Sequence, residues 1–331
     1  MSEQQPTPSI PAPKALSVAP MMDWTTRHAR NFLRLCHPHA RLYTEMVTTQ
    51  ALVHGDVPRH LRFETEEHPI ALQLGGSDRA DLVHCAKLGE DWGYDEINLN
   101  VGCPSDRVQQ GRIGACLMAE PDHVSEVVAA MQAAVKIPVT VKHRIGIDGL
   151  ERYEDMLDFV DKVAARGCTH FIVHARIAIL AGLSPKENRE VPPLRYTDVY
   201  RLKQERPQLT IELNGGVKTV DEIISHWQHT DGVMIGREAY QNPYLLVEAQ
   251  RLWGVSELPS RADILRAYLP FVERELAAGC PLNQITRHIL GLFQGVPGGR
   301  RYRQVLSTQA HLPGAGINVL KAAAAAAGID L

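Results

Sequence analysis

The sequence of 331 residues has no long apolar run, no closely paired cysteines and almost no excess charge of either sign. No stretch approaches the about 18 consecutive apolar residues that a membrane-spanning helix needs, so we expect no membrane span. Residues 1–14 contain four prolines and no apolar core, which predicts a disordered leader rather than a secretory signal.

The cysteines are too scattered to indicate a zinc site or a disulfide scaffold. No two of the six have CxxC spacing, and a chain of this length does not need disulfides to fold; they are Cys36, Cys85, Cys103, Cys116, Cys168 and Cys280. We therefore expect no metal site and a reducing, cytoplasmic environment.

The total charge conceals an uneven distribution. Lys plus Arg is 35 and Asp plus Glu is 38, so the net charge is 35 − 38 = −3, which taken whole excludes a basic nucleic-acid-binding protein. Residues 261–331, however, carry 8 basic and 4 acidic residues, or +4, which leaves −7 for residues 1–260. The charge pattern alone favours a solvated face over a nucleic-acid contact.

Eight short apolar segments alternate with helical patterns. They are residues 16–20, 42–44, 70–74, 96–98, 139–143, 170–174, 210–214 and 232–235. Helical patterns lie between most of them, at residues 77–88, 122–135, 151–166 and 219–227. This alternation predicts right-handed βαβ units and a parallel sheet, either a closed (β/α)8 barrel or an open doubly wound sheet.

Polar residues at the predicted strand ends favour the (β/α)8 TIM barrel, because barrel active sites form at that face. They are Gln73, Asn98, Asn100, Lys142, His174 and Asn214. After about residue 255 only helical patterns remain, at residues 264–278, 282–293, 301–310 and 318–327. We therefore predict an α/β barrel over residues 15–255 and a small all-α helical-bundle domain over residues 256–331.

Two glycine motifs end the seventh and eighth predicted strands. Asn214-Gly215-Gly216 and Gly236-Arg237 would let backbone N–H groups approach a ligand closely, and these two loops form the usual phosphate site of a barrel. Either motif alone is compatible with an ordinary tight turn. Together they favour phosphate binding, to which Arg237 would add a charge-assisted bond.

Lys142 and Cys103 are the reactive candidates. Lys142 ends a core strand, so it is a Schiff-base lysine, a cation facing an anionic cofactor ring, or a lysine snorkelling to the barrel rim. Cys103 follows a strand and a glycine and precedes Pro104, which makes it a candidate acid, base or nucleophile. The alternative for a single cysteine is a small buried apolar residue.

Together these segments resemble the tRNA-dihydrouridine synthase family. The resemblance is carried, in order over about residues 15–310, by residues 19–23, 98–105, 142–144, 174–176, 214–216 and 236–237. Residues 182–189 and 291–298 resemble the bacterial A subfamily, which acts on positions 20 and 20a of the tRNA D-loop. The family fold is an FMN-binding barrel followed by a helical domain.

The resemblance implies a flavin site. Pro20, Met21 and Met22 would line the flavin ring, Gln73 would bond its pyrimidine edge, and Lys142 would lie on the N1/O2 side, where charge accumulates on reduction. His174 would hold the ribityl-phosphate region. The phosphate would be held by Asn214, Gly215, Gly216, Gly236 and Arg237.

The resemblance also implies the reaction. NADPH reduces FMN, a hydride passes from flavin N5 to C6 of a flipped uridine, and Cys103 protonates C5 while Asn100 orients the uracil. A thiol, with a reference pKa of about 8.5, holds its proton at neutral pH and gives it up readily. Lys186, Arg189, Arg300 and Arg303 would contact the tRNA; no protein partner is implied.

The sequence departs from the subfamily beside the expected RNA contacts. The segment Ile177-Ala178-Ile179 replaces a common Lys-Ala-Trp, which removes a cation and an aromatic ring, and Tyr302 replaces a tryptophan. Two other functions fit parts of the pattern: a flavin barrel reducing a free pyrimidine, as in dihydroorotate dehydrogenase, and a non-enzymatic RNA-binding barrel. The basic helical domain argues against the first, and the set Gln73, Cys103, Lys142 and His174 argues against the second.

Overall fold

The computed structural model describes residues 13–105 and 111–331. Residues 1–12, most of the expected leader, lie outside the described part, as do residues 106–110. Lys14, the last residue of the expected leader, donates from Nζ to the carbonyl oxygen of Thr230 at 2.8 Å.

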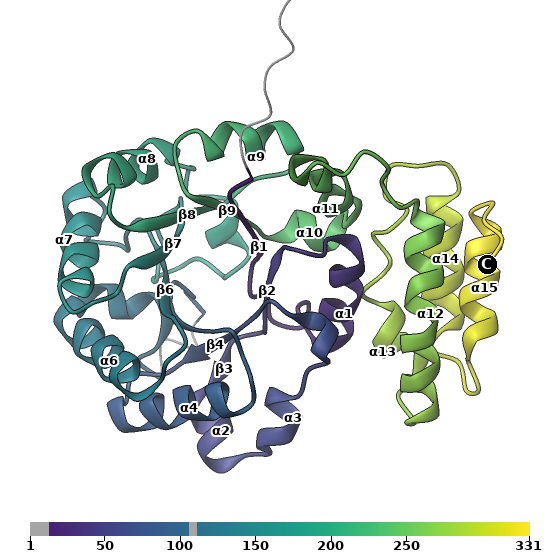
Figure 1. Ribbon diagram of the computed structural model, residues 1–331, viewed down its shortest axis with the longest axis horizontal. Helices are drawn as coiled ribbons and strands as arrows, with labels where there is room; N and C mark the ends of the chain where they lie inside the picture. The colour runs from purple at the N-terminus through teal and green to yellow at the C-terminus, as the bar shows by residue number, and fades with distance from the viewer. Residues whose placement is uncertain (1–12, 106–110) are drawn as a thin grey trace, which may run out of the picture.

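All eight predicted strands are present, and they close into a parallel barrel. They are β1 (Ala15–Val18), β2 (Arg41–Tyr43), β4 (Ile70–Gly75), β5 (Glu96–Val101), β6 (Val139–Arg144), β7 (His170–His174), β8 (Thr210–Asn214) and β9 (Gly232–Ile235). Neighbours pair in chain order, β2 pairs with β4, and β1 pairs with β9. This closure confirms the (β/α)8 barrel and excludes the open sheet (Figure 1).

One short strand was not predicted. β3 (Val47–Thr48) pairs with the last two residues of β4, in the register Val47↔Leu74 and Thr48↔Gly75. Two residues are too few to show a period-2 pattern in the sequence.

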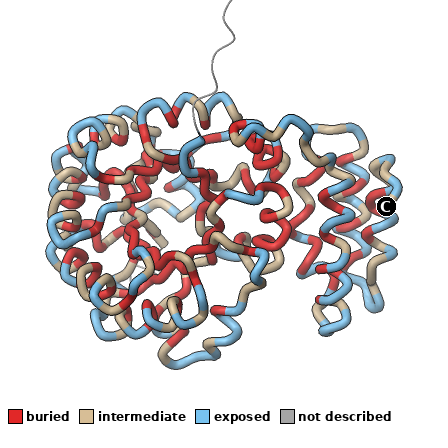
Figure 2. The backbone as a smooth tube through the Cα atoms, viewed as in Figure 1, coloured by how far each residue is buried: buried red, intermediate tan, exposed pale blue. Residues whose placement is uncertain are grey.

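Helices surround the strands, and their polar caps explain where several begin. They are α1 (Arg27–Cys36), α2 (Thr49–His54), α3 (Val57–Leu61), α4 (Arg79–Asp91), α6 (Pro121–Ala134), α7 (Tyr153–Ala164), α8 (Tyr196–Glu205), α9 (Val220–Trp227), α10 (Arg237–Gln241) and α11 (Tyr244–Ala249). Thr26, Asp78 and Thr219 each accept a backbone N–H of the first turn that follows. Buried residues concentrate on the strands and on the inner helix faces (Figure 2).

The barrel floor, at the N-terminal ends of the strands, holds two buried carboxylates. Glu96 accepts hydrogen bonds from Tyr43 at 2.7 Å and from Arg41 at 2.8 Å. Glu212 pairs with His170 at 2.9 Å. Buried carboxylates are stable only when bonded in this way.

The helical domain contains α12 (Arg261–Ala277), α13 (Leu282–Thr286), α14 (Gly299–Gln309) and α15 (Ile317–Ala326). The predicted helix over 282–293 is wrong beyond Thr286, because the following segment packs tightly against α10. A Cβ atom at Gly291 would lie 2.5 Å from the Gln241 carbonyl oxygen. None of the helices in the described ranges is long and apolar enough to cross a membrane.

The start of α1 joins the helical domain to the barrel (Figure 1). His288, from the segment after α13, bonds Thr26 through Nε2 and Tyr240 through Nδ1, each at 3.0 Å. Glu275 of α12 pairs with Arg27 and with His28. His28, Glu275 and Cys280 bring their donor atoms within 4.8 Å of one another, but the Arg27 guanidinium already neutralises this carboxylate.

Candidate active site

The predicted site residues meet at one face of the barrel, because the strands are parallel and their C-terminal ends share that face. Gln73 lies in β4, Asn98 and Asn100 in β5, and Lys142 in β6. His174 and Asn214 are the last residues of β7 and β8. Pro20, Met21 and Met22 follow β1; Met21 packs on the inner barrel core, while Met22 is 57% exposed.

The open face at the C-terminal ends of the strands is the mouth of the barrel. A chain of side-chain hydrogen bonds runs through the barrel from this mouth to the floor. Asn100 Nδ2 donates to Gln73 Oε1, Gln73 Nε2 to Asn98 Oδ1, and Asn98 Nδ2 to Thr140 Oγ1, each at 2.8 Å. Thr140 then donates to Glu96 Oε1 at 2.7 Å.

The direction of this chain is fixed at both ends. The Glu96 carboxylate can only accept, so Thr140 donates to it and every amide above must point the same way. At the mouth, Asn100 Oδ1 accepts the backbone N–H groups of Gly102 and Cys103, at 3.1 and 3.0 Å, and these can only donate. The Gln73 amide therefore has one orientation.

Cys103 lies at the edge of the mouth on a tightly held loop. Its N–H donates to Asn100, and its carbonyl oxygen accepts the Ala115 N–H at 2.9 Å. The thiol is half-buried and lies 3.6 Å from Ser105 Oγ. The backbone is thus fixed while the sulfur can meet a ligand in the mouth.

Lys142 and Asn214 cross the mouth toward each other. Lys142 Nζ donates to Asn214 Oδ1 at 3.1 Å, and Asn214 Nδ2 donates to the Met234 carbonyl at 2.8 Å. Burial lowers the pKa of Lys142 to about 7, and the nearby Arg144 charge acts in the same direction. An anion beside this ammonium would restore its charge.

Cations dominate the region around His174. Burial holds the pKa of His174 well below its ordinary value, and the charges of Arg144, Lys142 and Arg176 act in the same direction, so the imidazole is neutral at pH 7. A neutral ring among several cations is a donor set that suits an anionic ligand. The residues present therefore fit a phosphorylated cofactor.

The turn after β8 requires glycine. Gly215 and Gly216 have φ of +126° and +76°, and a Cβ atom at Gly216 would lie 2.7 Å from the Tyr196 hydroxyl. That hydroxyl donates to the Gly215 carbonyl at 2.8 Å, which fixes the turn from outside. At Gly236, by contrast, the nearest neighbour of an added Cβ would be Asn214 Nδ2 at 4.0 Å, so a ligand has room there.

Arg237 begins α10, but its side chain is held by the loop after β7. Its guanidinium forms an ion pair with Glu190 at 2.8 Å, with side-chain exposures of 38% and 48%. The same loop carries Lys186 and Arg189, both exposed. The structure thus brings Arg189 and Arg237 together and places Arg300 and Arg303 in the other domain, in the first turns of α14.

Three residues of the mouth were missed from the sequence: Arg144, Asn188 and Glu190. For Arg144 a signal existed, because it follows Lys142 by two positions in a strand and so shares its face. Asn188 holds the loop that contains Ile177 and Ile179, accepting the Ile179 N–H at 2.7 Å and donating to the Ile179 carbonyl at 2.8 Å. The two isoleucines therefore leave the backbone of this loop well anchored.

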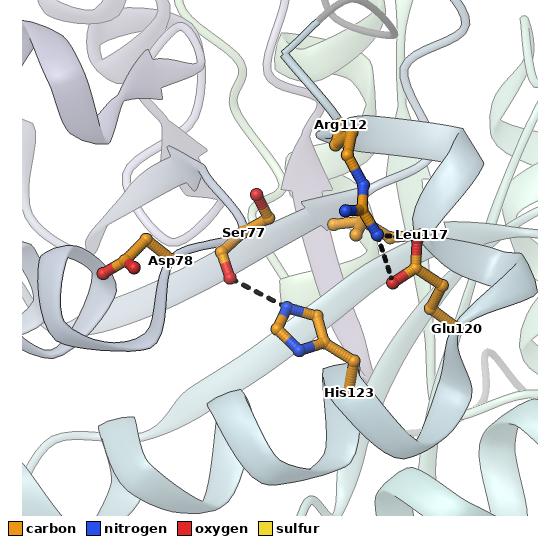
Figure 3. Close-up of a pocket in the computed structure, with 6 residues that line it drawn as sticks. All are labelled: Ser77, Asp78, Arg112, Leu117, Glu120 and His123. Carbon is orange, nitrogen blue, oxygen red and sulfur yellow. Dashed lines mark hydrogen bonds and ion pairs between the residues drawn. The ribbon is translucent and has the colours of Figure 1, made fainter.

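A separate polar pocket of about 350 Å³ lies beside the mouth (Figure 3). It is lined by Ser77, Asp78, Arg112, Leu117, Glu120 and His123. His123 bonds the Ser77 carbonyl at 2.8 Å, and Arg112 pairs with Glu120 at 2.9 Å, so its charged groups are largely satisfied within the protein. None of the predicted site residues lines it.

The fold and site define a TIM-barrel protein with a mouth rich in cationic side chains, a thiol at its rim and an appended helical domain. Comparison with known families sharpens this class: residues 17–327 match the model of the dihydrouridine synthase (Dus) family. The chain belongs to the dihydrouridine synthase family.

Similar proteins cover almost the whole chain. It is 58% identical over 313 residues to a tRNA-dihydrouridine(20/20a) synthase of Vibrio cholerae, covering 94% of this chain and 95% of the relative. It is 58% identical over 310 residues to the protein of that name from Synechocystis, covering 93% of each. The protein of the same name from Escherichia coli is 57% identical over 308 residues, covering 92% of this chain and 89% of its own.

Proposed function

We propose that this chain reduces the C5–C6 double bond of uridine in tRNA to give 5,6-dihydrouridine, at positions 20 and 20a of the D-loop. The observation that carries the proposal is the half-buried Cys103 thiol, held at the rim of a mouth whose other polar groups suit an anionic cofactor. The relatives that match along more than nine-tenths of the chain bear the name of this activity.

The cofactor would be FMN, with NADPH as the reductant. When bound and reduced, FMN supplies the hydride that reaches C6 of the uracil. Pro20, Met21 and Met22 would line its ring, and Gln73 would meet its pyrimidine edge with the Nε2 hydrogen and Oε1 lone pair that the barrel chain leaves free. The phosphate end would be held by His174, Asn214, Gly215, Gly216, Gly236 and Arg237.

Lys142 would stabilise negative charge on the flavin. Its ammonium has an amide as its hydrogen-bond partner and a pKa near neutrality, so an anion beside it gains a full charge interaction in a site of low dielectric. The hydrogen bond to Asn214 keeps the ammonium in place.

Cys103 would deliver the proton to C5 of the uracil. The backbone of Cys103 is fixed by Asn100 and Ala115, which leaves the direction of the sulfur to one side-chain torsion. Asn100 would orient the uracil with its remaining Nδ2 hydrogen, since its other polar atoms serve the loop and Gln73.

The tRNA would dock across the mouth and the helical domain. Lys186 and Arg189 are exposed on the loop after β7, and Arg300 and Arg303 lie on α14. A groove of about 280 Å³ on the helical domain adds Arg287 and His311 and has no acidic residue in its lining. The basic surplus of residues 261–331 supports a role in holding a phosphate backbone.

The test is an assay of the purified protein with FMN and NADPH on unmodified tRNA and, separately, on free uridine. We expect dihydrouridine at positions 20 and 20a of the tRNA, read by mass spectrometry of nuclease fragments, and no turnover of free uridine. Equal efficiency on free uridine would replace the tRNA function with that of a free-pyrimidine reductase. A flavin-free protein that binds tRNA without product would leave an RNA-binding function.

A further inference from the structure

Arg144 is a buried cation whose hydrogen-bond partners are backbone carbonyl groups. The residue is 3% exposed. Its Nε donates to the Gly102 carbonyl at 2.9 Å, and its Nη1 donates to those of Ile177 at 2.9 Å and Asn188 at 3.0 Å. Within residues 13–105 and 111–331, no carboxylate forms an ion pair with this guanidinium.

Such an arrangement is unfavourable unless the geometry repays it. Burial lowers the pKa of Arg144 to about 10, so the side chain stays charged at neutral pH. A planar guanidinium can direct several N–H groups at once toward acceptors in different directions, which a lysine ammonium cannot reproduce over the same span. Arg144 uses this property to hold segments that follow two different strands.

The first segment is the one that carries the thiol. The Gly102 carbonyl belongs to the peptide group that joins Gly102 to Cys103, and the N–H of that same peptide group donates to Asn100. Arg144 and Asn100 therefore fix this peptide plane from both edges, and with it the position of the Cys103 Cα atom, from which the side chain extends.

The second segment is the loop after β7, which carries Lys186 and Arg189. Asn188 closes this loop on itself through bonds from Nδ2 to the carbonyls of Ile179 at 2.8 Å and Leu183 at 3.1 Å. Arg144 donates one hydrogen bond to the Asn188 carbonyl at one side of the closed loop and another to the Ile177 carbonyl at the other side. The same guanidinium therefore bonds both the loop after β7 and the Gly102 carbonyl that precedes Cys103.

We propose that Arg144 is a positioning residue that joins the Cys103 loop to the loop after β7, so that the placement of the thiol depends on the seating of the loop proposed to meet the RNA. This rests on the proposed function only in the role given to Cys103. The link between the two loops is a property of the protein without substrate.

The experiment compares Arg144→Lys with Arg34→Lys. Arg34 is a matched control, because it too is buried, donates to carbonyl groups throughout the described part of the chain, and has a pKa lowered to about 10 by burial. Its partners, His37, Pro38, Glu67 and Pro69, lie at the opposite end of the barrel. Loss of general stability is therefore common to both variants, whereas a change at the thiol is specific to Arg144.

The first readout is the alkylation rate of Cys103 by iodoacetamide, followed by peptide mass spectrometry to separate it from the other cysteines. We expect the alkylation rate of Cys103 to increase about fivefold in Arg144→Lys and to stay unchanged in Arg34→Lys. The factor of about five corresponds to the loss of one hydrogen bond that restrains the Gly102–Cys103 peptide group. Equal rates in both variants would overturn the proposal, whatever the enzyme does to tRNA.

The second readout uses enzyme whose flavin has been reduced beforehand. Arg144→Lys should slow single-turnover formation of dihydrouridine by about tenfold or more, because misplacement of a reacting group is costly, while NADPH reduces the bound flavin at the wild-type rate. A matching loss in flavin reduction would show a general defect and contradict the inference. Inactive wild-type protein would instead defeat the proposed function and leave the alkylation result intact.

If Arg144→Lys does not fold, Asn188→Ala tests the same link from the loop after β7. This substitution removes the buried amide that closes that loop and leaves the Arg144 guanidinium in place. It should raise the Cys103 alkylation rate, and the two substitutions combined should have less than the product of their separate effects. An unchanged rate in Asn188→Ala would show that the two loops are independent.

Discussion

The Lys142 ammonium and the Asn214 side-chain oxygen meet at 3.1 Å, joining the ends of β6 and β8 across the barrel mouth. Because an amide is the hydrogen-bond partner of this ammonium, burial dominates its titration and its pKa falls to about 7. A cation held this way is close to losing its proton in the ligand-free protein and gains most from an anionic ligand.

Flavin affinity should therefore depend on pH through Lys142. Above pH 7 the ammonium must take up a proton when the anion binds, so the Kd of FMN should rise between pH 7 and 9, by at most about tenfold per unit. Lys142→Met should bind more weakly and show a flat profile, measured by fluorescence titration. The FMN phosphate is already ionised in this range, and a flat wild-type profile would contradict the assignment.

The same shift predicts the sign of a stability change. A lysine whose folded pKa is lowered from 10.5 to about 7 binds fewer protons folded than unfolded between these values, so the free energy of unfolding rises with pH across that window. Lys142→Met should remove this rise and stabilise the ligand-free protein at pH 7 by about 1–3 kcal/mol. Urea unfolding at pH 7 and pH 9.5 measures both effects.

Replacing Cys103 by alanine should separate binding from chemistry. The variant should keep FMN and its reduction by NADPH, since within the residues that the structure describes the thiol bonds only Ser105. Formation of dihydrouridine should fall by about 10²- to 10⁴-fold, the range for loss of a general acid. Cys116→Ala, a second partly exposed thiol, serves as the control; full activity in Cys103→Ala would remove the thiol from the mechanism.

Glu190 should weaken phosphate binding by holding Arg237. The pair is partly exposed, so its interaction is modest, and Glu190→Gln should tighten FMN by about twofold to fivefold. Riboflavin, which has no phosphate, should bind both forms equally. Arg237→Gln should weaken FMN without altering riboflavin, and a loss of FMN affinity in Glu190→Gln would show that the ion pair supports the site instead.

The RNA contacts should appear in the salt dependence of binding. Removal of a cation that touches one phosphate should reduce the slope of log K against log salt by about 0.7–0.9. Lys186→Ala and Arg300→Ala should each show this reduction, whereas Arg266→Ala should not, because Arg266 is occupied by Asp263 and by the Asp330 carbonyl. Filter binding between about 50 and 200 mM salt is a suitable range; an unchanged slope would place that cation outside the interface.

The barrel floor should give a pH-dependent stability of its own. Burial alone would lower the pKa of His170, but its hydrogen bond and charge interaction with Glu212 raise that pKa above 6.5. Burial alone would raise the pKa of Glu212, but the hydrogen bond and charge of His170 lower it below its ordinary value. The contribution of the pair is therefore full between about pH 4.5, the ordinary pKa of a glutamate, and about pH 6.5. It declines as the pH falls through the lowered folded pKa of Glu212 and as the pH rises through the folded pKa of His170.

His170→Gln should test this pair. The variant should lower the free energy of unfolding by about 2–4 kcal/mol at pH 6 and by less at pH 9, measured by thermal or urea unfolding. His229→Gln, a histidine stacked on Tyr200 at the outside of the barrel, is the control. A loss that does not change between pH 6 and pH 9 would show that the imidazole is neutral in the fold.

Strand positions were predictable because local patterns determine them, and contacts between distant segments were not. The polar residues Gln73, Lys142 and Asn214 stand out at the ends of apolar segments, so the sequence indicated one functional face. The break after Thr286 depends on how closely Gly291 approaches α10, which is a tertiary contact. No local pattern could reveal it.

The site shows the same division. The glycines of the β8 turn were identifiable from the motif alone, and the structure adds the reason, which is their positive φ. The pairing of Arg237 with Glu190 joins residues 47 positions apart and depends on how one loop folds over another. The assembly around Arg144 depends likewise on backbone carbonyls, which carry no sequence signature.

The one-way chain of amides beneath the mouth has a consequence for ligand discrimination. Gln73 cannot turn over unless Asn98 and Asn100 turn with it, and the Glu96 carboxylate and two backbone N–H groups oppose that reversal. A ring whose edge offers donors and acceptors in the opposite order would meet like groups and lose about 1–3 kcal/mol for each unmet bond. The Glu96 carboxylate at the barrel floor would thereby help to decide which heterocycle the proposed site accepts.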